Sequence, residues 1–238
     1  MIRKDHIIVL RSIRQGERNL VVTCYSRTGG KEAIFLKNVG KNIRPYIYPL
    51  SVLECTLSGT RKNGLSTAYE LTPVFQTASL RNDVYKYAMS QYMAELIYRT
   101  TEDLNPDPEM YRMITMEAKL LNDLAMGYAN LHLHFTVDYI SHLGYRPVDN
   151  WSEETPYFAI EESKFINSPP NAYNIMPYRL SLLMHYFCSR TQEQILMTAA
   201  SAYERAEFLR WMVKYISFHS SKNIQIVSLE VITDIFTN

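Results

Sequence analysis

The sequence predicts an α+β protein in which a five-stranded barrel of the OB type is followed by a mainly α-helical domain. Two observations lead to this fold class. The 238 residues have a formal net charge of only +1, yet residues 1–78 carry +7 and residues 79–238 carry −6. Six of the eight glycines fall before residue 65, and the hydrophobic period lengthens after Pro73 from two residues to three or four. We therefore expect two domains, residues 1–78 and 79–238, and their charge asymmetry favours contact with nucleic acid or a membrane.

Five short runs of apolar and β-branched residues predict the strands of the barrel. These runs cover residues 7–10, 20–25, 33–36, 52–57 and 65–71. The dipeptides Gly29-Gly30 and Asn63-Gly64 are typical of hairpin turns. One long connection, residues 37–51, separates the third run from the fourth, and this arrangement favours a small closed barrel over an open sandwich.

Three helices are predicted between residues 79 and 147. The first carries its apolar residues three and four apart from Tyr85 to Leu96, with Ser79 as its N-cap. The second begins at Asp107-Pro108, a cap followed by a proline at the first helical position. The third runs from about residue 131 to Gly144, and Pro147 stops it.

The remainder of the chain is less regular. An irregular insert at residues 148–176 contains three prolines and no clear helix; they are Pro156, Pro169 and Pro170. Helices resume near Pro177, after Thr191 (a capping pair with Gln194) and at residues 208–217. The apolar tail, residues 224–236, is either a strand or a segment packed on the helices.

Composition narrows the class of protein further. At 47% hydrophobic residues the chain can bury a sizeable core. No apolar run approaches the ~18 residues needed to span a bilayer, and the start has no signal-peptide core, so we expect a cytoplasmic protein without a membrane partner. Three separated cysteines, Cys24, Cys55 and Cys188, are expected to be free core thiols.

No pattern of catalytic or cofactor chemistry is present in the sequence. Zinc needs about four Cys or His ligands in close pairs, whereas His132 and His134 are expected to be surface or interface histidines. The five acids of residues 1–78 are dispersed, unlike the clustered carboxylates of metal-dependent nucleases. Hydrolase and nucleotide-binding motifs are absent. We therefore expect no enzyme, catalytic residue, metal or cofactor.

Cations and aromatic side chains concentrate in the first domain. Between Arg27 and Arg44 the only acid is Glu32. Such a surface binds phosphates without reading sequence, and neighbouring aromatic rings stack single-stranded bases. The candidate DNA-binding residues are Arg11, Arg14, Arg27, Lys31, Lys37, Lys41, Arg44, Tyr46, Tyr48, Arg61 and Lys62, with Arg18 close by.

Two other interpretations of this surface stay open. The cations can form a solvated face with tyrosines covering the core, in which case the chain is a protein-interaction scaffold with little DNA affinity. The second interpretation is that the chain is an enzyme without a known motif. Metal-dependent nicking of a labelled strand would reveal such an activity.

Several segments, in their order and spacing, resemble the bacterial RecO family of recombination mediators over most of the chain. The segments are KDHIIVL at 4–10, GERN at 16–19, PL at 49–50 ahead of LE at 53–54, FTVDYISHLGYRP at 135–147, and residues 208–219. The resemblance implies a non-catalytic protein that binds single- and double-stranded DNA and anneals complementary strands, including strands coated by the single-strand binding protein SSB. It also implies action with RecR to load RecA on gapped DNA.

The chain departs from the family pattern at two places. Many members have four zinc-binding cysteines after the Leu-Gly-Tyr segment, but residues 148–177 contain none, so we expect a zinc-free branch whose proline-rich packing holds this segment. Members place arginines before the phenylalanine of the third helix, where they bind the acidic SSB tail. Here His132 and His134 precede Phe135, and residues 227–229 read VSL where the family has Lys-Ser-Arg. Neutral histidine is a weaker carboxylate partner, so we expect the SSB tail contact to be weaker or to lie elsewhere.

Overall fold

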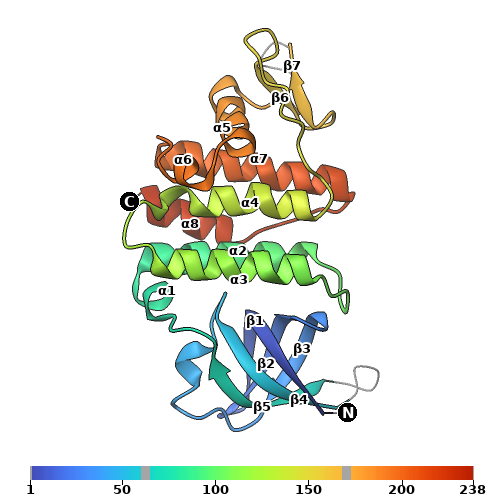
Figure 1. Cartoon of the computed structure of the whole chain (residues 1–238), viewed down its shortest axis with the longest axis vertical. Helices are drawn as coiled ribbons and strands as arrows, with labels where there is room; N and C mark the ends of the chain where they lie inside the picture. Colours follow the sequence, from blue (N-terminus) through green and yellow to red (C-terminus); the bar gives the residue numbers. More distant parts are fainter. Residues whose placement is uncertain (1, 60–64, 168–172, 238) are drawn as a thin grey trace. The chain divides into compact units, whose positions relative to one another are not determined.

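The computed structural model describes residues 2–59, 65–167 and 173–237 (Figure 1). The chain forms two compact units, residues 1–123 and residues 124–238. The first unit contains a closed barrel and three helices, and the second is mainly helical. The predicted fold class, an OB-type barrel followed by a helical region, is confirmed.

All five predicted strands are present. They close into a barrel in the order β1-β2-β3-β5-β4 (blue to cyan in Figure 1). The parallel pair β3–β5 closes the barrel, and the other pairs are antiparallel. The strands are β1 (Ile2–Gln15), β2 (Asn19–Ser26), β3 (Gly30–Leu36), β4 (Val52–Ser58) and β5 (Ser66–Pro73). The predicted turn at Asn63-Gly64 lies outside the described residues.

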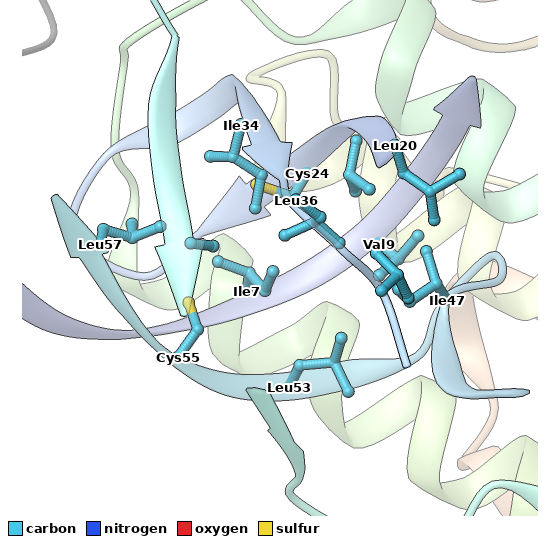
Figure 2. Packing of buried hydrophobic residues seen from close by; sticks show 13 residues of the cluster. Ile7, Val9, Leu20, Cys24, Ile34, Leu36, Ile47, Leu53, Cys55 and Leu57 are labelled. Atoms are coloured by element: carbon cyan, nitrogen blue, oxygen red, sulfur yellow. The ribbon is translucent and has the colours of Figure 1, made fainter. Parts of the chain in front are cut away.

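β1 is longer than its two neighbours because it pairs with them along successive stretches. Residues 2–8 pair with β4 and residues 7–15 pair with β2, with a register shift between Val9 and Arg11. Side chains alternating inward from all five strands fill the barrel (Figure 2). Among them are Ile7, Val22, Cys24, Ile34, Leu53, Cys55 and Leu57. The expectation that Cys24 and Cys55 are free core thiols is confirmed, whereas Cys188 is only half-buried.

Three helices complete the first unit: α1 (Ala78–Asn82), α2 (Val84–Thr100) and α3 (Pro108–Asp123). The Asp107 carboxylate accepts hydrogen bonds from the amides of Glu109 and Met110, as the sequence predicts for its cap. The prediction of Ser79 as the N-cap of the long helix is wrong. A short separate helix contains Ser79, and Asp83 caps α2 through the amides of Tyr85 and Lys86.

The segment between α2 and α3 attaches these helices to the barrel. The Leu104 amide donates to the Lys31 carbonyl at 2.9 Å, and the Asp107 amide donates to the Tyr25 hydroxyl at 3.1 Å. This segment therefore lies along the part of β3 that β5 does not pair. The change from strand to helix falls after Pro73, as the sequence predicts, while the compact unit extends to Asp123.

The second unit is built around α4 (Leu131–His142), which packs against α7 (Ala202–Ser220) (Figure 1). The other helices are α5 (Tyr178–Ser189), α6 (Gln192–Leu196) and α8 (Ser228–Thr237). Thr191 and Gln194 form the predicted capping box. The tail forms α8, which packs on α7, so the strand alternative for residues 224–236 is wrong.

The predicted irregular insert contains the two-stranded sheet of β6 (Tyr157–Ala159) and β7 (Lys164–Ile166). Its described residues are held by an aromatic cluster and by Asn150, which makes two hydrogen bonds with the Phe165 backbone. The Phe158 ring lies 5.2 Å from Phe165 and 5.8 Å from Tyr215. Aromatic packing is therefore what the sequence interpretation missed in this segment, and Pro169 and Pro170 lie outside the described residues.

A substitution at Gly30 tests the attachment of the helices. Gly30 has φ +68°, and a Cβ there would overlap the Asn105 backbone. Gly16 has a similar φ of +74°, but its Cβ would meet open space. Gly16→Ala should lower the free energy of unfolding by about 1–2 kcal/mol, the usual cost of left-handed backbone. Gly30→Ala should lower it clearly more in urea denaturation, and equal losses would contradict the close approach.

Candidate nucleic-acid interface

Five exposed cations gather at one end of the barrel, where the β1–β2 turn meets the β3–β4 connection. The Val39 amide donates to the Arg18 carbonyl at 2.7 Å, and Arg44 Nη2 donates to the Glu17 carbonyl at 3.5 Å. None of the five forms an ion pair with a carboxylate within the described residues. This loop-end cluster consists of Arg14, Arg18, Lys37, Lys41 and Arg44.

The single acid of this stretch, Glu32, does not reduce the surface charge. Its side chain is buried and accepts hydrogen bonds from Ser26 and, at 2.6 Å, from Arg3. Arg3 also pairs with the buried Asp5 at 3.2 Å. Because buried carboxylates need such partners, Arg3, Asp5 and Glu32 form an internal network. The exposed charged side chains from Arg27 to Arg44 are therefore all cations.

The two candidate tyrosines differ in accessibility. Tyr48 is buried, and its hydroxyl donates to the Thr77 carbonyl. Tyr46 ends a short 3-10 helix (Arg44–Tyr46); it is half-buried and donates to Gln76 at 2.9 Å. Tyr46 lines a pocket of about 250 Å³ together with Lys41 and Arg81. The half-buried Tyr46 packs against the barrel core, and two cations line the pocket beside it. The sequence interpretation missed one of them, Arg81.

Lys31 is held inside the first unit. Its ammonium donates to the carbonyls of Tyr98 at 3.0 Å and Thr101 at 2.5 Å, and pairs with Asp103 at 3.2 Å. A cation at this position stabilises the carboxyl end of α2, where helix carbonyls lack backbone partners. With 13% of its side chain exposed, Lys31 joins the barrel to α2 and has little surface for a ligand.

The remaining candidates lie apart from the loop-end cluster. Arg27 is exposed in the β2–β3 turn, at the opposite end of those strands, and Arg61 and Lys62 lie outside the described residues. Arg11 is exposed on β1, with its guanidinium 5.9 Å from the centre of the Tyr98 ring. Arg99 lies 5.7 Å from the same ring.

Tyr98 and Arg99 line a second pocket, of about 480 Å³, with Thr23 and Ala33 of the barrel. Sequence reasoning missed both residues because they belong to a helix assigned to the acidic domain. Residues paired side by side across β1, β2 and β3 form rows. The row next to Thr23 and Ala33 on the same face consists of Ile13, Val21 and Phe35, and Ile13 is 51% exposed. This apolar row lies between the second pocket and the loop-end cluster, on the strand face with which OB folds bind oligonucleotides.

The three residues predicted for the SSB tail are mostly interior. His132 and Phe135 are buried, so the interpretation of His132 as a surface histidine is wrong. The His132 ring stacks on Phe236 at 5.6 Å. His134 is half-buried and lines a pocket of about 640 Å³ with His142 and Arg146.

Metal ligands are not brought together among the described residues. No three His, Cys, Asp or Glu side chains among them lie close enough to hold a metal ion. Burial raises the pKa of the Cys55 thiol to about 12 and that of Cys24 well above its usual value, which keeps both thiols protonated. The arrangement suits binding to a polyanion.

The fold and this surface define an OB-barrel protein with a basic surface that also contains aromatic residues, and with a second, helical unit. A model of "Recombination protein O N terminal" matches residues 1–76, and one of "Recombination protein O C terminal" matches residues 81–225. The chain belongs to the recombination protein O (RecO) family. The relatives it matches carry the name DNA repair protein RecO. No described helix has the length and apolar character to cross a membrane.

Relatives of full length support this membership. The chain is 22% identical to the DNA repair protein RecO of Flavobacterium psychrophilum, over 98% of this chain and 99% of that protein. It is 23% identical to the protein of the same name from Phocaeicola vulgatus over the whole of both chains. Identity to the Bacillus subtilis protein is 30%, over 52% of this chain and 49% of the relative.

The buried His132 makes stability depend on pH. Burial, with a smaller contribution from the charge of Arg205, lowers its pKa from 6.5 to about 3. Between these pH values His132 binds a proton in the unfolded chain but stays neutral in the folded chain. The free energy of unfolding therefore falls as pH drops from about 6.5 towards 3, by up to ~1.4 kcal/mol per pH unit.

His132→Phe keeps a ring against Phe236 but cannot titrate. Urea denaturation between pH 8 and 4 should show the unmodified chain losing stability faster below pH 6.5 than this variant. Above pH 7 the two profiles should run parallel, which provides the internal control. Parallel profiles over the whole range would contradict the effect.

Proposed function

We propose that this protein is a recombination mediator in DNA repair, acting in the cytoplasm at the nucleoid. It binds single- and double-stranded DNA without sequence preference, anneals complementary strands, including strands coated by SSB, and with RecR helps to load RecA on gapped DNA. It needs no cofactor and catalyses no reaction. The observation that carries this proposal is the loop-end cluster: five exposed cations beside the half-buried Tyr46 on an OB barrel.

The mechanism we propose is electrostatic. Exposed Lys and Arg side chains replace the counterions of DNA phosphates, which gives affinity without sequence specificity. Tyr46 stacks a base of a single strand, and the apolar row with Phe35 offers a further platform. Two strands held on one basic surface repel each other less, so pairing becomes easier.

The domain roles follow the same division. Residues 1–78 are the DNA-binding domain, assisted by Tyr98 and Arg99 from α2. The second unit serves protein partners, RecR and the acidic tail of SSB. Of the residues first assigned to that tail, His134 is the one that lines a surface pocket.

Neutralising three cations of the cluster tests the DNA contact. Lys37→Ala, Lys41→Ala and Arg44→Ala together should weaken binding to DNA. They should also reduce the slope of log affinity against log salt by roughly two or more, at about 0.7–0.9 per lost phosphate contact. Fluorescence anisotropy with a labelled oligonucleotide over a salt series measures both.

The matched control replaces three exposed lysines elsewhere, Lys119, Lys164 and Lys222. This variant loses the same charge but should keep the salt slope. If the cluster variant also keeps its slope, these residues do not bind phosphate. If the unmodified chain shows no salt-dependent binding at all, the scaffold alternative holds.

Tyr46 separates stacking from charge. Tyr46→Ala should lower affinity for single-stranded DNA by about 1–3 kcal/mol, the usual value of one stacked base. Tyr46→Phe keeps the ring and loses only the hydroxyl bond to Gln76, so its affinity should stay close to that of the unmodified chain. Duplex binding should respond to neither change, and an equal loss for both variants on single strands would assign Tyr46 a structural role.

A further inference from the structure

The outer face of β1, β2 and β3 has cations at both ends of its apolar row. At one end lies the loop-end cluster, in which Lys37 directly follows the last residue of β3. At the other end the guanidinium carbons of Arg11 and Arg99 lie 5.9 Å and 5.7 Å from the centre of the Tyr98 ring. We call Arg11, Tyr98 and Arg99 the Tyr98 group. The two groups of cations are therefore separated by apolar side chains.

The charges of the Tyr98 group are available to a ligand. Arg11 is exposed and has no carboxylate partner within the part of the chain that the structure describes. Arg99 pairs with Glu95 one helical turn away at 3.3 Å, but exposed pairs of this kind are weak and exchange readily with other anions. The exposed acid Asp103 is neutralised by Lys31, whose ammonium lies 3.2 Å from its carboxylate. An anion at this end of the face thus meets two arginines.

The Tyr98 group also borders a hollow of the right size for a nucleotide. Tyr98 and Arg99 line the pocket of about 480 Å³ together with the small side chains of Thr23 and Ala33. Pockets of roughly 300–1,000 Å³ are typical of small-ligand sites. Bases stack on aromatic rings and on arginine side chains, so this pocket suits a base whose phosphate contacts the arginines.

The strand register gives the separation of the two groups of cations. Thr23 and Ala33 are paired, and Val21 and Phe35 of the apolar row lie two residues further along the same strands. Lys37 follows two residues after Phe35. Four residues of strand from Ala33 to Lys37 cover ~14 Å at the usual rise of about 3.4 Å per residue. This length is close to the ~12 Å width of the major groove of B-DNA, across which two backbones face each other.

We propose that the Tyr98 group binds a second DNA strand while the loop-end cluster holds the first, so that the bases of the two strands meet over the apolar row. The inference rests on the proposed function, because it requires that the loop-end cluster binds DNA. One strand needs cations on one side of a stacking surface, and a second strand accounts for the group on the other side. With both strands on one chain, pairing becomes an intramolecular step at a raised effective concentration.

Counting the strands bound to the full chain tests the second site. The probe is a labelled oligothymidine of about six nucleotides, which is within the site size of a single OB fold. At saturation in sedimentation velocity, the unmodified chain should bind two probe molecules, and the variant carrying Arg11→Ala and Arg99→Ala should bind one. The matched control, Arg112→Ala with Arg190→Ala, loses the same charge at exposed positions elsewhere and should bind two. One probe on the unmodified chain, or two on the Arg11/Arg99 variant, would overturn the inference.

A second pair of variants keeps both arginines and changes only the charge of the pocket. Thr23→Glu places a carboxylate beside the Tyr98 group and should reduce the count to one probe. Thr23→Gln has nearly the same size without the charge and should still bind two. Equal counts for the two variants would contradict an anion site in this pocket.

Annealing of complementary strands separates this inference from the proposed function. In the Arg11/Arg99 variant the annealing rate, measured by fluorescence quenching, should fall about tenfold or more, because pairing returns to a bimolecular step. Its affinity for one strand should stay within about twofold, since the loop-end cluster keeps its phosphate contacts. Unchanged annealing would overturn the second site while leaving DNA binding by the loop-end cluster intact. Absence of DNA binding in the unmodified chain would defeat the proposed function and this inference together.

Discussion

The position of the candidate interface depends on one constraint, the register of the strand pairs that form the barrel. A single strand that pairs with β4 along its first half and β2 along its second can close five strands into a barrel. The antiparallel pairing of β2 with both β1 and β3 brings the β1–β2 turn and the start of the long β3–β4 connection to the same end. The nearest cations of the two segments, Arg18 and Lys37, are 19 positions apart in the chain, yet the two groups form one surface. Closure of the barrel through β4 then holds the far end of the long connection against β1, where the Val9 amide donates to the Ser51 carbonyl at 2.9 Å.

Local signals predicted much of this fold, because they act within a few residues. Strand alternation located all five strands, and the side chains of Asp107 and Thr191 identified two helix starts. The error at Ser79 has the same local origin, because Asp83 is an equally good cap four residues later. The tail was ambiguous since an apolar run has no period that separates a strand from a buried helix, and only its packing on α7 decides for α8.

The sequence predicts the basic stretch as a whole but not which of its residues are accessible, because burial decides which charges reach the surface. Lys31 and Arg44 are equally good candidates in the sequence. In the structure, Lys31 is held by the carbonyls at the carboxyl end of α2, whereas Arg44 is exposed. Glu32 is an acid in the middle of the basic stretch, and its pairing with Arg3 removes it from the surface. Tyr98 and Arg81 come from helices that fold onto the barrel. No local pattern contains such long-range contacts.

The charge asymmetry has a different meaning once the units are known. The barrel with its three helices, residues 1–123, carries +4, and residues 124–238 carry −3. Because charges on α1 to α3 reduce the excess of the barrel, the field of the first unit as a whole is modest. At physiological ionic strength it is screened beyond about 8 Å, so attraction of a polyanion over long distances contributes little. The proposed affinity for DNA therefore depends on direct contacts, and a compact group of exposed cations at one end of the barrel provides these more effectively than the same charges spread over the surface.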